Sequence, residues 1–192
     1  GSLSLRQPYA LTVDDGVVYA GFSGARLKAL SLQNGELQWE ARLSRSMGAN
    51  ELERLNDVVA APVVDANQVC AVAYQGRLAC YAKNTGALLW SREASSYQAL
   101  TMDATQVYLT DDMGIVQAFN KETGATNWKQ DKLFARQVSA PLILDSTLYV
   151  GDYQGYVYAL DSQTGALVAR VETDGSPIKT PAQAFNQQVV VQ

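Results

Sequence analysis

Cysteine and aspartate are the residue types whose positions in this 192-residue sequence could support chemistry. Cys70 and Cys80 flank the turn Tyr74-Gln75-Gly76. A three-residue loop would place the two cysteines directly opposite each other, whereas a two-residue loop would place them on opposite faces of a hairpin. An oxidising compartment would then allow a disulfide. In the repeat described below they replace tyrosine and alanine, which favours ordinary buried thiols.

Aspartates recur at one position of the same repeat. Asp14, Asp65 and Asp103 occupy this position in three copies, counted back from the glycine that each copy shares. A recurring turn aspartate is most simply a side-chain cap on the backbone. The adjacent pairs Asp14-Asp15 and Asp111-Asp112 point apart, because neighbouring residues on a strand face opposite ways. Metal binding requires several oxygen ligands on one ion, so we expect turn capping and no metal site.

The composition excludes several classes of function. The sequence has no histidine, which rules out histidine acid–base chemistry and histidine metal ligands. Its two cysteines are too few for a four-cysteine zinc site. The net charge of −4 argues against nucleic acid or an anionic membrane as the partner. No apolar run approaches the roughly 18 residues of a transmembrane helix.

A repeat of about 40 residues organises the chain, and such a period indicates an array of supersecondary units. Four segments align without gaps on single glycines, with tryptophan four residues later in three copies and alanine in the last. The segments are 30–39, 81–90, 119–128 and 160–169, and their glycines are Gly35, Gly86, Gly124 and Gly165, hereafter the anchor glycines.

Each copy predicts four short strands. The clearest copy has strand-like runs at 139–144, 147–152, 156–161 and 166–172, separated by turns rich in Gly, Asp and Ser. Each copy is therefore a four-stranded antiparallel meander, and imperfect alternation suggests that both faces are covered. Stacked β-propeller blades have this property, whereas a β-sandwich does not explain the repeat.

The predicted fold class is an all-β β-propeller. Residues 1–192 would form a partial propeller of about four blades and part of a fifth, which belong to a larger ring. The blades are expected at approximately 4–42, 57–94, 95–134 and 136–174, with a partial blade at 176–192 and an inter-blade insertion at 42–57. The insertion carries both charged and apolar residues. It could bind a partner or pack on its own blade.

The Gly-x-x-x-Trp turns resemble the PQQ-like repeats of quinoprotein alcohol dehydrogenases, a β-propeller family related in architecture to WD40 repeats. In those enzymes, the resemblance implies, a quinone lies beside calcium, a catalytic aspartate and a vicinal Cys-Cys pair. This sequence has no Cys-Cys, and packing between blades explains its tryptophans. We therefore expect no cofactor. A fragment of a PQQ-dependent periplasmic dehydrogenase is the alternative function.

Two stretches, LSLRQPYA (3–10) and GANELERLNDVVAAPVV (48–64), resemble a second family more specifically. They are similar to the C-terminal half of BamB proteins, lipoprotein subunits of the outer-membrane β-barrel assembly machinery. The resemblance implies an eight-bladed ring on the periplasmic face of the outer membrane, with an N-terminal lipid anchor outside this sequence. It also implies a non-enzymatic scaffold that binds the POTRA domains of BamA and supports unfolded outer-membrane protein clients.

The resemblance also implies a partner-binding site. Carried over residue by residue, the site comprises Leu3, Leu5, Arg6 and Asp57. A second acidic position of the family falls on Val59, so the acidic pair is incomplete here.

The repeat supports this site independently. Arg6 and Asp57 occupy the same repeat position on consecutive copies, and Ser95 and Arg136 continue this column on the next two. Equivalent positions on neighbouring blades lie side by side on one rim, so leucines, an arginine and a carboxylate could form one hot spot. A generic protein-binding propeller would lack this affinity for BamA. Because a partial ring leaves open sheet faces, two copies could also stack into a homodimer.

Overall fold

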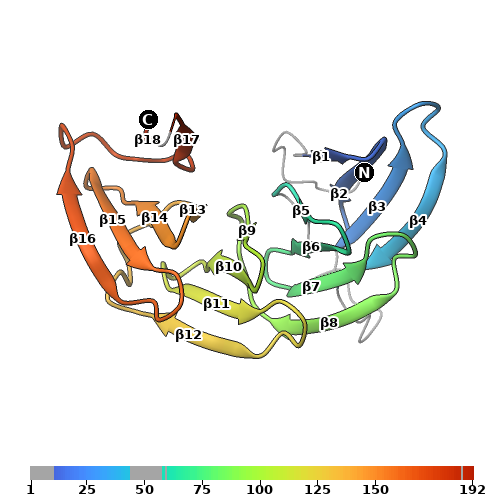
Figure 1. Ribbon diagram of the computed structural model, residues 1–192, viewed down its shortest axis with the longest axis horizontal. Helices are drawn as coiled ribbons and strands as arrows, with labels where there is room; N and C mark the ends of the chain where they lie inside the picture. The colour runs from blue at the N-terminus through green and yellow to red at the C-terminus, as the bar shows by residue number, and fades with distance from the viewer. Residues whose placement is uncertain (1–10, 44–57, 59, 187) are drawn as a thin grey trace. The chain divides into compact units, whose positions relative to one another are not determined.

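The computed structural model describes residues 11–43, 58, 60–186 and 188–192, and every regular element in these ranges is a β-strand (Figure 1). The chain divides into two compact units, Gly1–Tyr97 and Gln98–Gln192. Each unit is described by itself. The strands confirm the prediction of an all-β fold built from four-stranded antiparallel meanders.

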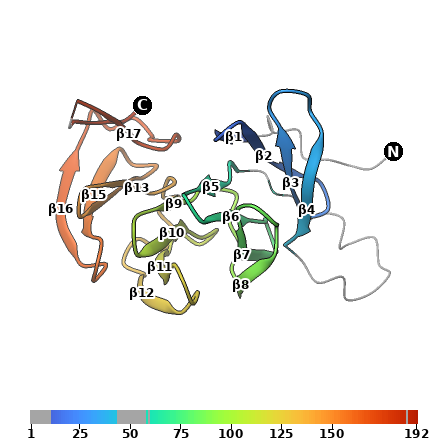
Figure 2. The same cartoon turned by 45° about the vertical axis from the view of Figure 1, so that its right-hand side comes forward.

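The first unit holds two four-stranded sheets with strand orders β1-β2-β3-β4 and β5-β6-β7-β8. Strands β1 and β5 lie side by side in both views (Figure 1 and Figure 2). The first sheet consists of β1 (Leu11–Asp14), β2 (Val17–Phe22), β3 (Arg26–Ser31) and β4 (Leu37–Arg42), and the second of β5 (Val63–Val64), β6 (Gln68–Val72), β7 (Arg77–Ala82) and β8 (Leu88–Glu93).

The second unit holds two further four-stranded sheets and a two-stranded hairpin. The third sheet consists of β9 (Thr101–Met102), β10 (Gln106–Thr110), β11 (Val116–Asn120) and β12 (Thr126–Gln130). The fourth consists of β13 (Leu142–Leu144), β14 (Thr147–Gly151), β15 (Tyr156–Asp161) and β16 (Leu167–Glu172), and the hairpin of β17 (Gln183–Phe185) and β18 (Gln188–Val190).

The anchor glycines have a backbone conformation that explains their recurrence. All four have φ between 68° and 72°, a left-handed region that side chains other than glycine rarely occupy. Each lies in the turn before the fourth strand of its sheet, and its N–H donates to the carbonyl four residues earlier, as Gly86 does to Ala82 at 2.9 Å. A register shift follows the same position of the third strand in every sheet, as between Ala29 and Leu30.

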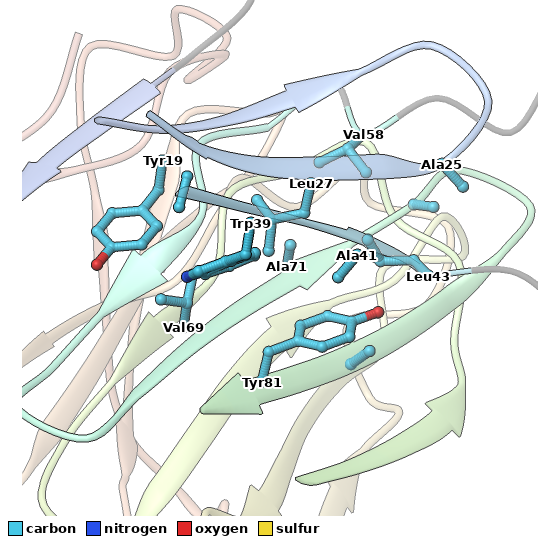
Figure 3. Close-up of a cluster of buried hydrophobic side chains, with 13 residues drawn as sticks. Tyr19, Ala25, Leu27, Trp39, Ala41, Leu43, Val58, Val69, Ala71 and Tyr81 are labelled. Carbon is cyan, nitrogen blue, oxygen red and sulfur yellow. The ribbon is translucent and has the colours of Figure 1, made fainter. Parts of the chain in front are cut away.

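Tryptophans pack one sheet onto the next within each unit. Trp39 is 8% exposed, its Nε1 donates to the backbone carbonyl of Lys83 at 2.9 Å, and Tyr19 lies 5.9 Å from it between ring centroids. Figure 3 shows these rings in one cluster with Val69 and Tyr81 of the second sheet. Burying so much aromatic surface stabilises the pair of sheets.

The second unit repeats this arrangement. The Nε1 of Trp128 donates to the backbone carbonyl of Ser162 at 2.9 Å, and the Tyr108 ring lies 6.1 Å away. Trp90 is buried as well. The prediction that the tryptophans serve packing is confirmed. Ala169 takes the fourth position after Gly165 in the last copy, and all six residues of β16 are exposed.

The two cysteines form a disulfide, so the expectation of ordinary thiols was wrong. Cys70 and Cys80 are direct cross-strand partners, with Cα atoms 4.1 Å apart. Ala73 N–H donates to Arg77 O at 3.1 Å, which closes the three-residue loop that brings the cysteines opposite each other. The disulfide is buried. It occupies the place of a Tyr–Ala pair in the other sheets, for example Tyr19 opposite Ala29.

Candidate partner-binding surface

The residues predicted to bind a partner, Leu3, Leu5, Arg6 and Asp57, lie outside the described residues, as does Val59. So does most of the insertion at 42–57. The structure nevertheless describes residues that flank them and residues that share their position in the repeat. Their contacts show how the surrounding sheets position the neighbouring segments.

Val58, the residue after Asp57, is fixed against the first sheet. Its side chain is 1% exposed and belongs to the core cluster of the first unit (Figure 3). It lies over Gly21 in β2, where an added Cβ would stand 2.5 Å from Val58 O and 2.6 Å from Val58 Cβ. Only glycine leaves room for this approach. The chain that enters the second sheet therefore starts from a fixed point on the first.

The second unit uses the same device. Ile178 lies over Gly151 in β14, where an added Cβ would stand 2.8 Å from Ile178 Cβ, and its N–H donates to Asp152 O at 3.0 Å. Gly21 and Gly151 occupy the same position of the repeat, counted back from the anchor glycines of their sheets. In both units, therefore, the segment that connects two sheets packs an aliphatic side chain against a glycine of the preceding sheet.

The entries to the first two sheets also contact each other directly. The Thr12 hydroxyl in β1 donates to the backbone carbonyl of Pro62 at 2.6 Å. Counted back from Gly35 and Gly86, Thr12 and Pro62 occupy adjacent positions of the repeat. Nearly equivalent positions on the two sheets are therefore neighbours.

Arg136 shows the environment of the column to which Arg6 and Asp57 belong. Its Nη1 donates to Asp152 Oδ2 at 3.0 Å and to Gln154 Oε1 at 2.8 Å, and Tyr153 N donates to Arg136 O at 3.2 Å. These partners form the β14–β15 turn. Ser95, in the same column, accepts a hydrogen bond from the N–H of Gln75 in the β6–β7 turn. The column therefore lies beside hairpin turns in both units.

A buried carboxylate neutralises Arg136. Asp152 is 0% exposed and also accepts the Tyr158 hydroxyl at 2.9 Å. Its hydrogen bond raises the pKa of the Arg136 guanidinium, while burial raises the pKa of Tyr158 to about 12. Arg136 is therefore cationic and Tyr158 neutral at any physiological pH. Asp152 is the residue that sequence reasoning missed, because its role depends on the turn geometry of its sheet.

The recurring aspartates divide between two roles. Asp65 Oδ1 accepts the N–H groups of Asn67 and Gln68, and Asp103 Oδ1 accepts those of Thr105 and Gln106. The predicted turn caps are confirmed at both positions. Asp14 differs, because its carboxylate pairs with Lys83 of the second sheet.

Lys83 joins the two sheets of the first unit. Its side chain is 7% exposed, and its Nζ contacts Asp14 and lies 2.8 Å from Asp15 Oδ2. The expectation that Asp14 and Asp15 point apart was therefore wrong, because Asp15 lies in the turn after β1 with a positive φ of 46°. The hydrogen bond from Lys83 lowers the pKa of Asp15. These contacts connect residues that are far apart in sequence, so the spacing of the repeat could not reveal them.

The described ranges contain no group of three or more Cys, Asp or Glu side chains that could hold a metal ion. They also contain no helix of the length and apolarity needed to cross a membrane.

Comparison with known proteins identifies the family. The family model described as "Outer membrane protein assembly factor BamB" matches residues 1–130 and 112–192. A protein of that name from Nitrosomonas eutropha is 44% identical over 191 residues, which is 99% of this chain and 47% of the relative. The Escherichia coli K12 protein of that name is 32% identical, over 100% of this chain and 49% of its own length. The chain spans about half the length of these relatives.

Solved structures agree. The crystal structure of BamB from Moraxella catarrhalis matches with a TM-score of 0.88 at 29% identity, over 99% of this chain and 57% of that one. This likeness confirms the predicted β-propeller fold. A europium-containing methanol dehydrogenase matches with a TM-score of 0.64 at 14% identity, which shows a shared fold and nothing of activity.

The relatives are named as assembly factors, which bears out the expectation that this chain is not an enzyme and disfavours the dehydrogenase alternative. On the family model, the relatives and the crystal structure together, the chain belongs to the BamB family of outer-membrane protein assembly factors.

Proposed function

We propose that this chain is a non-enzymatic scaffold of outer-membrane protein assembly that binds the POTRA domains of BamA. The binding surface comprises Leu3, Leu5, Arg6 and Asp57. By holding BamA at the periplasmic face of the outer membrane, the scaffold supports the folding and insertion of unfolded outer-membrane proteins. The full-length protein is held at that membrane by an N-terminal lipid.

The observation that carries the proposal is the contact between Val58 and Gly21. Asp57 immediately precedes Val58, whose side chain is keyed into the first sheet. Arg6 stands shortly before β1, the first strand of that same sheet. Val58, the neighbour of Asp57, is thus fixed on the sheet that follows Arg6 in the chain. This supports one surface shared by Arg6 and Asp57, although the two residues are far apart in sequence.

The column occupied by Arg136 adds a second argument. In the fourth sheet, Asp152 neutralises the arginine of this column. The residue at the equivalent repeat position of the first sheet is Phe22, which has no charge. Arg6 therefore has no equivalent carboxylate in its own sheet. We expect its guanidinium to be available for a carboxylate on another protein.

The disulfide supports the proposed compartment. Cys70 and Cys80 are joined and buried in the second sheet. Disulfides form and persist in oxidising surroundings such as the bacterial periplasm and are rare in the cytosol. A chain whose two cysteines form one buried crosslink is suited to folding on the periplasmic side.

Capture on immobilised POTRA domains of BamA from the same organism tests the proposal. We expect the wild-type chain to be retained and the Leu5→Ala variant to be retained poorly, because the lost leucine removes apolar burial. A Leu88→Ala variant is the matched control, since Leu88 is an exposed leucine on β8. Equal retention of the two variants, or no retention of the wild-type chain, would contradict the proposal.

A further inference from the structure

A groove in the second unit lies between the β12–β13 connection and the outer strand β16. Its volume is about 380 Å³. The side chains used below are Lys132, Leu133, Arg136, Tyr158, Val168 and Arg170. Leu133 and Tyr158 are buried and form its floor, and Val168 is 60% exposed at its side. The groove thus combines an apolar surface with three cationic residues.

Two of the three positive charges are not neutralised within the described chain. Arg136 is paired with Asp152. The Arg170 guanidinium lies 4.9 Å from the Tyr156 ring centroid, and neither it nor the Lys132 ammonium forms an ion pair with any described carboxylate. The groove is therefore locally positive on a chain whose net charge is −4. A negatively charged ligand complements it.

The fourth sheet differs from the first at one pair of facing positions. In the first sheet, the corresponding cross-strand positions hold Lys28 and Glu40, whose side chains pair at 3.1 Å. In the fourth sheet the same positions hold Tyr158 and Arg170. The internal ion pair is thus replaced by an aromatic ring and an arginine that is left for a ligand.

Strand β16 adds a second recognition element. It is the last strand in the order β13-β14-β15-β16, so its outer edge has no described strand partner. All six of its residues are exposed. Edge strands present backbone N–H and C=O groups to which an extended peptide can pair, and side-chain pockets then select the sequence. A small anion would pair with the cationic side chains but would form no backbone hydrogen bonds with this edge.

We propose that this groove binds an extended acidic peptide segment of a partner protein, which pairs with the edge of β16 and directs carboxylates to Arg170 and Lys132. Alternate side chains of the peptide face one way, so an apolar–acidic alternation places carboxylates toward Arg170 and Lys132 and directs its apolar side chains to the other face of β16, where Val171 is exposed. The site uses none of Leu3, Leu5, Arg6 or Asp57 and does not depend on the proposed binding of BamA.

Fluorescence anisotropy with a labelled ten-residue peptide of alternating Glu and Val tests the proposal on the whole chain. We expect the peptide to bind, and a Lys–Val peptide of the same length to bind at least tenfold more weakly. Arg170→Glu and Lys132→Glu should each weaken binding of the acidic peptide at least tenfold. Lys129→Glu is the matched control, because Lys129 is exposed and holds on β12 the position that Arg170 holds on β16, and it should change the affinity less than twofold.

Several outcomes would overturn the proposal. Equal binding of the two peptides, or an equal loss in the Lys129 control, would mean that no specific site exists. Unchanged affinity for a peptide methylated on alternate backbone nitrogens would exclude pairing with β16. Free glutamate competing as well as the peptide would show a small-anion site instead. Arg170→Gln serves if Arg170→Glu fails to fold and should show the same direction of loss. Arg136 is left intact because it neutralises the buried Asp152.

Discussion

The indole of Trp39 lies directly against Gly86, so the anchor glycine of one sheet receives the tryptophan of the sheet before it. An added Cβ on Gly86 would stand 2.7 Å from Trp39 Cδ2, and one on Gly165 would stand 2.6 Å from Trp128 Cδ2. The glycine is therefore required twice, for its positive φ and for the space above its Cα. This double requirement explains why the Gly-x-x-x-Trp pattern recurs.

Gly86→Ala and Gly35→Ala separate the two requirements. Gly35 has the same positive φ, but no described atom lies within 4 Å of its added Cβ. Gly35→Ala should cost about 1–2 kcal/mol of unfolding free energy, the cost of a left-handed alanine. Gly86→Ala should cost about 1–3 kcal/mol more, because the Trp39 ring must move. Denaturant unfolding measures both, and equal costs would contradict the proposed packing role of Gly86.

Gly21→Ala should affect both folding and partner binding. The new Cβ meets the Val58 backbone as well as its side chain, so the segment that carries Asp57 must shift. We expect a loss of about 1–3 kcal/mol in stability and weaker binding to POTRA domains. Gly151→Ala is the control, since its new Cβ meets the aliphatic side chain of Ile178 in the second unit. It should destabilise the chain by a similar amount and leave POTRA binding unchanged. Equal losses of binding in the two variants would mean that the contact between Gly21 and Val58 does not position the binding site.

Replacing the disulfide should destabilise the second sheet. Cys70→Ser with Cys80→Ser removes a crosslink between residues ten positions apart, which is worth about 2–3 kcal/mol in loop entropy. Cys70→Tyr with Cys80→Ala installs the pair found at these positions in the other sheets, as at Tyr108 and Ala118, and should recover part of the loss. Chemical denaturation measures the stabilities. Two free thiols titrating in the unfolded, unreduced wild-type chain would disprove the crosslink.

The bridge formed by Lys83 predicts an acid-sensitive contribution to stability. Lys83 lowers the pKa of Asp15 from its usual 3.8, so the contribution is present above that pH and is lost as the pH falls through the lowered value. Asp14 and Asp15 in their charged forms also raise the pKa of Lys83, which keeps it protonated at neutral pH. Lys83→Met should therefore melt below the wild-type chain near neutral pH, and the difference should shrink as the pH falls through the lowered pKa of Asp15. Lys129→Met is the exposed control, and a gap that does not change with pH would contradict the bridge.

The repeat made most of the fold predictable from the sequence. The features that were not predicted depend on contacts between particular pairs of residues. Gly86 and Trp90 mark local turns and strands, so a pattern in one copy predicts the same structure in every copy. The disulfide between Cys70 and Cys80 was not predicted, because their pairing depends on a one-residue difference in loop length. The ion pairs of Lys83 were not predicted for a different reason, since its partners belong to the neighbouring sheet. Of the candidate site, sequence supplies Arg6 and Asp57 as one column, while only the structure shows what fixes the segment beside them.

Titration calorimetry with POTRA domains of BamA tests most directly whether Arg6 and Asp57 form one binding surface. Arg6→Glu and Asp57→Arg should each leave the melting temperature nearly unchanged, because charges on the solvated rim proposed for them contribute only about 0–1 kcal/mol to folding. Each should weaken binding at least tenfold, or about 1.4 kcal/mol, because an interfacial charge loses its partner.

Lys129→Glu and Glu122→Arg, at exposed positions on other turns and strands, make the same charge changes and should bind like the wild-type chain. Wild-type affinity in the Arg6 and Asp57 variants, or unfolding of both, would contradict a shared binding surface formed by these two residues.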